Sequence, residues 1–178
     1  MTENSVLRQG ALVLFGSWAL AGLSQVSIGG PVPMTLQTLG VLLIGLTFGF
    51  RMAFAALAAY LVQGAIGLPV FAGGAGGAAH FIGPSGGYLV GFLFAAGLIG
   101  YLADKGFTKG WVGTMIALLA GTAVIYAFGL PWLGHLLGYE NMLAYGFTPF
   151  VLGDTIKLVL AALIGKGVLK GAATFAKL

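Results

Sequence analysis

Residues 52–103 read MAFAALAAYLVQGAIGLPVFAGGAGGAAHFIGPSGGYLVGFLFAAGLIGYLA and contain no Asp, Glu, Lys or Arg. Because about 20 apolar residues are enough for one helical crossing of a bilayer, this stretch is long enough for more than one. The glycines and prolines between Gly67 and Gly87 would separate the crossings. The stretch therefore predicts membrane-spanning helices on either side of a glycine-rich loop.

The 178-residue chain as a whole has the same character, with 59% hydrophobic residues, 7% charged residues and a mean hydropathy of +1.03. Since a soluble domain carries about 25% charged residues, an ordinary soluble enzyme or binding module is excluded. A disordered chain is also excluded, because it needs low hydrophobicity and high charge. The remaining class is an all-α, polytopic membrane protein, whose 32 glycines would allow close helix packing.

Uncharged stretches and the breakers between them predict six transmembrane helices in one domain over residues 1–178. The second and third are short, so a re-entrant hairpin with only four full crossings is an alternative. The less apolar segment 130–145, which contains Trp and Tyr, is interpreted as an interfacial piece. The six predicted helices are Leu7–Val26, Thr35–Phe50, Arg51–Ile66, Ser85–Ala103, Trp111–Leu130 and Pro149–Val168.

The placement of the eight basic residues along the chain predicts its orientation in the membrane. The net charge of the chain, +4, is less informative, and we do not interpret it as a nucleic-acid signal. The loops 27–34, 67–84 and 131–148 contain no Lys or Arg. By the positive-inside rule both termini are cytoplasmic. A cleaved signal peptide ending near Ala21 is an alternative. Its removal would take away one crossing, and the basic residues would then no longer all lie on one side of the membrane. The seven basic residues on the predicted cytoplasmic side are Arg8, Arg51, Lys105, Lys109, Lys166, Lys170 and Lys177.

Asp154 and Lys157 are the charged residues that do not fit this pattern, because they lie near the external end of the sixth helix. Their i, i+3 spacing places them on one face of a helix. Ionisable groups in membrane helices are costly and usually face a cavity, a partner or a substrate. The pair suits a ligand with both donors and acceptors. A structural ion pair, or a Lys157 that reaches to the interface, is the alternative.

Two further segments are candidate parts of a site. Thr35, Gln37 and Thr38 are polar groups in an apolar setting and need hydrogen-bond partners, which a helix cap or a neighbouring helix would also supply. The glycine-rich loop contains aromatic residues that a plain connector does not require, so we interpret it as an uncharged lid over an apolar pocket. Its alternative is a flexible connector.

The sequence gives little support for metal binding, catalysis or nucleotide binding. The chain has no cysteine, and its two histidines have no ligand-like spacing, so no metal site is predicted. There is no nucleophile–base motif, no pair of acids for catalysis and no phosphate-binding loop ending in Lys-Ser/Thr. A non-catalytic capture protein with one site near the outer surface is the interpretation that remains.

Four ordered segments carry a resemblance to a known family. They read PVPMTLQTLGVLL at 31–43, GAIGLPVFAGG at 64–74, GPSGGYLVGF at 83–92 and GDTIKL at 153–158. Together they resemble the BioY family of prokaryotic biotin transporters, the substrate-binding S components of energy-coupling factor transporters. The resemblance implies a six-helix fold in the cell membrane with a biotin pocket open to the outside. It also implies partners, namely a transmembrane coupling T subunit and two ATP-binding cassette ATPases.

The resemblance, together with the chemistry of biotin, suggests roles for particular residues. Substrate binding would use Asp154, Lys157, Gln37, Thr35, Phe71, Gly73, Gly74, Gly76 and Tyr88. Docking on the T subunit, which the family achieves through an Ala-xxx-Ala spacing, would use Ser17 and Ala21, with Ser in place of the first Ala. No cofactor is expected beyond the ligand biotin. An S component for a different vitamin and a non-catalytic assembly subunit are the alternatives.

Overall fold

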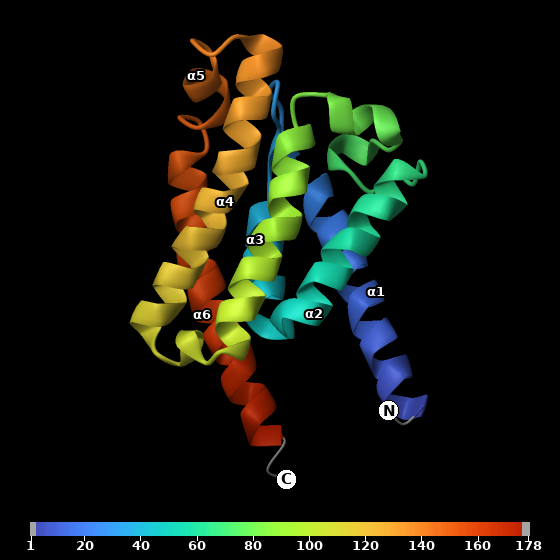
Figure 1. The fold of residues 1–178 in the computed structure, drawn as a ribbon, viewed down its shortest axis with the longest axis vertical. Helices are drawn as coiled ribbons and strands as arrows, with labels where there is room; N and C mark the ends of the chain where they lie inside the picture. The colour runs from blue at the N-terminus through green and yellow to red at the C-terminus, as the bar shows by residue number, and fades with distance from the viewer. Residues whose placement is uncertain (1–2, 176–178) are drawn as a thin grey trace.

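The computed structural model describes residues 3–175, with side chains from residue 6 to residue 171, and this part of the chain is mostly helical (Figure 1). A two-residue antiparallel pair, Ser27–Ile28 (β1) and Met34–Thr35 (β2), closes the first loop. The α-helices are Glu3–Gln25 (α1), Gln37–Ala65 (α2), Gly86–Asp104 (α3), Trp111–Leu137 (α4), Met142–Gly146 (α5) and Val151–Phe175 (α6). Three 3₁₀ turns are Ala72–Gly74 (η1), Ala78–Ile82 (η2) and Phe107–Lys109 (η3).

Within the described residues, five helical segments are long and apolar enough to cross a bilayer. They are α1, α2, α3, α4 and the segment Met142–Gly171, which contains α5 and most of α6. The predicted helical architecture with several membrane-competent helices is therefore confirmed. The helix count differs from the six predicted, because the predicted second and third helices form the single element α2.

α2 is sharply kinked at Gly49, whose φ of 73° and ψ of 171° interrupt the helix. Figure 1 shows the first half of α2 descending behind α3 and the second half rising from the kink. The backbone N–H of Phe50 donates to Oδ2 of Asp104 at 2.9 Å, so Asp104 caps the second half. A side chain at Gly100 would overlap the backbone of Gly49 and Phe50, so the kink needs glycine on both helices.

The predicted clustering of basic residues at one end is present in the described residues. The beginning of α1, the kink in α2, the α3–α4 turn and the end of α6 all lie at the lower end in Figure 1. Lys177 lies outside the described residues. The basic residues of this end are Arg8, Arg51, Lys105, Lys109, Lys166 and Lys170.

α4 continues seven residues beyond the predicted end at Leu130, so the predicted interfacial piece over 130–145 is wrong in its first half. Pro131 lies within the helix, and the next turn is held by packing, because Leu133 and Gly134 are buried. The indole Nε1–H of Trp132 also donates to the carbonyl of Gly83 at 2.9 Å. Tertiary contacts therefore offset the hydrogen bond that proline removes.

Candidate ligand-binding site

A cavity lies at the end of the molecule opposite the basic residues. It is enclosed by the segment that leads into α2, by residues 66–85 (the cap loop), and by α3, α4 and α6. The lining residues are Val32, Pro33, Thr35, Gln37, Thr38, Phe71, Ala72, His80, Ser85, Tyr88, Leu89, Phe92, Ile125, Tyr126, Phe150 and Asp154.

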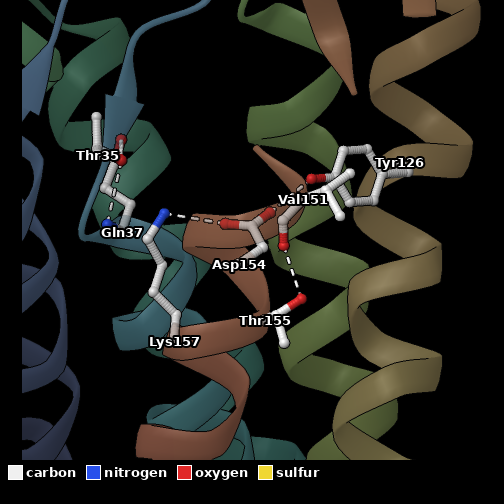
Figure 2. Close-up of polar contacts among 7 residues, drawn as sticks. All are labelled: Thr35, Gln37, Tyr126, Val151, Asp154, Thr155 and Lys157. Atoms are coloured by element: carbon white, nitrogen blue, oxygen red, sulfur yellow. Dashed lines mark hydrogen bonds and ion pairs between the residues drawn. The ribbon is translucent and has the colours of Figure 1, made fainter. Parts of the chain in front are cut away.

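Asp154 is the charged group of the cavity and is only 8% exposed. The ammonium of Lys157, a residue that is 9% exposed, donates to its Oδ1 at 2.9 Å, so the predicted pairing on one helix face is confirmed. The Tyr126 hydroxyl of α4 donates to Oδ2 at 2.6 Å. In Figure 2 the two donors approach Asp154 from opposite sides, with the Lys157 ammonium on the side of Gln37. Two donors thus hold a buried carboxylate at the cavity wall.

Thr35 and Gln37 form a second polar group at the start of α2. The Thr35 hydroxyl donates to Oε1 of Gln37 at 3.1 Å and accepts from the Gln37 backbone N–H at 3.1 Å. The Gln37 amide donates to the Tyr60 hydroxyl at 2.6 Å, and that hydroxyl donates to the carbonyl of Val70 at 3.0 Å. These bonds fix the Gln37 amide and join the cavity to the cap loop.

Aromatic rings form much of the remaining wall. Phe71 is fully buried and packs edge-on against Tyr60, with ring centroids 5.5 Å apart. The Tyr88 hydroxyl donates to the carbonyl of Gly146 at 2.8 Å, which directs its ring into the cavity wall. The His80 ring stacks on Phe71 at 4.7 Å, and burial lowers the pKa of the His80 imidazole below its ordinary value. His80 is therefore neutral at pH 7 and adds no charge to this wall.

The three predicted loop glycines lie in the cap loop but do not line the cavity. Gly73 and Gly74 have φ values of 70° and 74°, which glycine adopts without steric cost. They form the turn that bonds the Phe71 N–H to the Ala75 carbonyl at 2.9 Å. Gly76 lies against the carbonyl of Leu68, with no room for a side chain. These glycines therefore shape the loop that holds Phe71.

Ser17 and Ala21, the predicted docking residues, are on the inner face of α1. Their side chains are 0% and 6% exposed, and the Ser17 hydroxyl accepts a hydrogen bond from the Gln63 amide of α2 at 3.2 Å. The structure thus places them between α1 and α2 and not on an outer surface. The large apolar side chains that α1 does expose are Val6, Leu7, Leu12, Leu14, Phe15 and Trp18.

Tyr126 and His80 are among the cavity residues that the sequence interpretation missed. Tyr126 lies 28 residues from Asp154, in a helix whose sequence contains no charge to mark a functional face. His80 was considered only as a metal ligand, whereas its ring is a neutral part of the wall. An aromatic hydroxyl at mid-helix in a membrane segment is the signal that would have identified Tyr126.

A family model described as the BioY family matches residues 1–174 of this chain. The chain belongs to the BioY family. Among its relatives, the biotin transporter BioY of Rhizobium etli is 40% identical over 162 residues, covering 86% of this chain and 87% of the relative. The biotin transporter BioY of Thermotoga maritima is 42% identical over 155 residues, with the same coverage of both chains.

A solved structure shares the fold of this BioY family member. It is the crystal structure of the S-component for biotin from an ECF-type ABC transporter. The two chains are 32% identical and superpose with a TM-score of 0.85, over 96% of this chain and 95% of the other. The helical arrangement described above is therefore that of a transporter S-component.

Proposed function

We propose that this chain is the high-affinity biotin-binding subunit of a biotin uptake system in the prokaryotic cell membrane. The observation that carries the proposal is the cavity itself. A buried carboxylate, held by Lys157 and Tyr126, faces a polar group and aromatic walls in a member of the BioY family. Relatives in this family are named biotin transporters. On this proposal, the chain is a transport subunit and not an enzyme.

The chemistry of biotin complements these groups. Its ureido ring has two N–H donors and one carbonyl acceptor, beside an apolar bicycle and a chain that ends in a carboxylate. Asp154 would accept from a ureido N–H, which is a charge-assisted hydrogen bond. Lys157 would meet the ureido carbonyl or the carboxylate, and Gln37 offers both a donor and an acceptor. Phe71 and Tyr88 would pack against the bicycle. The glycines of the cap loop would let the loop close over it.

The energy for transport would come from partners. The solved relative belongs to an ECF-type ABC transporter, so we propose a transmembrane T subunit and two ATP-binding cassette ATPases as partners of this chain. Docking through α1 is part of this proposal. Ser17 and Ala21 remain candidates only if α1 separates from α2 on assembly, because both are buried here.

Direct titration tests the ligand. Protein purified from biotin-free cells should bind biotin with a stoichiometry near one in isothermal titration calorimetry, and it should give no comparable signal with other vitamins. Binding of another vitamin without binding of biotin would replace the proposal by an S component for that vitamin. An absence of binding to every vitamin tested would favour an assembly subunit.

The proposed topology has six crossings, with the two halves of α2 counted separately, and cytoplasmic termini. It is tested by labelling, since the chain contains no cysteine. Ala79 is exposed in the cap loop and Lys105 is exposed in the α3–α4 turn. We expect Ala79→Cys to react with a membrane-impermeant maleimide on intact cells and Lys105→Cys to react only after the membrane is opened. The reverse pattern would invert the orientation.

A further inference from the structure

A second cleft lies at the opposite end of the molecule, between the kink of α2, the α3–α4 turn and α6. Within the described residues, it shares no lining residue with the ligand cavity. Its lining residues are Leu46, Thr47, Phe48, Gly49, Ala103, Asp104, Gly106, Thr108, Lys109, Lys166, Leu169 and Lys170. The proposed transport function gives this cleft no role.

The charge of the cleft is positive, because three lysines and one aspartate line it and leave a net charge of +2. Asp104 accepts the hydrogen bond from the Phe50 N–H that caps the second half of α2. Lys166 donates to the carbonyls of Thr108 and Lys109, at 2.6 Å each, and so fixes the turn. Lys109 and Lys170 are exposed at the cleft. The cleft therefore suits an anion that the latter two lysines reach.

The surroundings of these lysines are those of a membrane interface. The cleft lies where the apolar helices end, and its wall includes Leu46, Phe48 and Leu169. The Lys166 ammonium lies 5.8 Å from the centre of the exposed Trp111 ring. Tryptophan at a helix end is typical of the head-group region of a bilayer. A ligand in the cleft would thus meet both positive charge and apolar side chains.

We propose that this cleft binds the phosphate-bearing head group of an anionic phospholipid, with the beginning of an acyl chain against the apolar wall. Basic pockets between membrane helices are known to take such head groups. A free phosphate would use the lysines but would gain nothing from Leu46, Phe48 and Leu169. Because the cleft is separate from the ligand cavity, loss of this lipid should leave biotin binding intact.

Native mass spectrometry of the full chain tests the proposal, with phosphatidylglycerol and phosphatidylcholine titrated separately. We expect phosphatidylglycerol to bind preferentially. The double variant Lys109→Gln/Lys170→Gln should lose at least about tenfold in phosphatidylglycerol affinity. The matched control Arg8→Gln/Lys105→Gln removes the same charge from the same end, from residues that do not line the cleft, and should change the affinity less than twofold.

Four results would overturn the proposal. One is equal binding of both lipids by the unaltered protein. Another is an equal loss in both double variants, which would show a general effect of surface charge. The third is displacement of phosphatidylglycerol by millimolar inorganic phosphate, which would make the ligand a free anion. The fourth is a Lys109→Gln/Lys170→Gln variant that still binds lipid but no longer associates with the coupling subunit, which would assign the cleft to a protein partner. Biotin titration of the same variants shows that they are folded.

Discussion

Replacing Asp154 with alanine is expected to reduce the affinity for biotin by about 10- to 150-fold, the range for a lost hydrogen bond to a charged group. The carboxylate is 8% exposed and lies at the cavity wall, so water cannot readily take its place. Titration calorimetry of the purified variant measures the loss. Gly153→Ala is the control, because a side chain there meets open space one residue away on the same helix.

The same substitution should also destabilise the protein, since it leaves the ammonium of Lys157 buried without its partner. Removing one member of a buried ion pair costs about 3–5 kcal/mol. The double variant Asp154→Ala/Lys157→Ala removes both charges and should recover most of the thermal stability. It should not recover biotin binding.

This double variant separates the binding role from the structural alternative. If the pair only fixes α6, the stability and the biotin affinity should recover together in the double variant. If Asp154 contacts the ligand, the two measurements should diverge. Recovery of biotin affinity to within a few-fold of the unaltered protein would contradict the proposed site.

The positions of the helices followed well from the sequence, because uncharged stretches and glycine–proline breakers are local signals. The helix predicted over 85–103 occurs as α3 over Gly86–Asp104. The boundary predicted between Phe50 and Arg51 lies beside the kink at Gly49. The Asp154–Lys157 contact was also predictable, since residues three apart on a helix share a face.

Features that depend on contacts between distant segments did not follow from the sequence. Tyr126 reaches Asp154 across the α4–α6 interface, and no local pattern pairs two residues that far apart. α4 continues through Pro131 because its next turn packs against its neighbours. Ser17 was predicted from a spacing of small residues, but a spacing does not say which face of α1 is turned toward α2. The side on which a residue lies is decided by packing.

Replacing Gly64 with alanine is expected to cost at least about tenfold in biotin affinity, although it adds only one methyl group. A Cβ at this position would overlap the ring of Phe71, which is fully buried and lines the cavity. The ring cannot easily yield, because it packs against Tyr60, His80 and Phe81. Overpacking of this kind costs about 1–3 kcal/mol.

The direction of this effect is informative because Gly64 has an ordinary helical backbone. Alanine in a helix is otherwise favoured over glycine by about 1 kcal/mol, so Gly22→Ala, which meets open space on α1, should be neutral or slightly stabilising. Adding Phe71→Leu to Gly64→Ala should relieve the overlap and restore thermal stability. Affinity should stay low, because the aromatic wall is then lost. Unchanged biotin affinity in Gly64→Ala would mean that the position of Phe71 does not matter for the ligand, and the cap loop would have to bind it in another way.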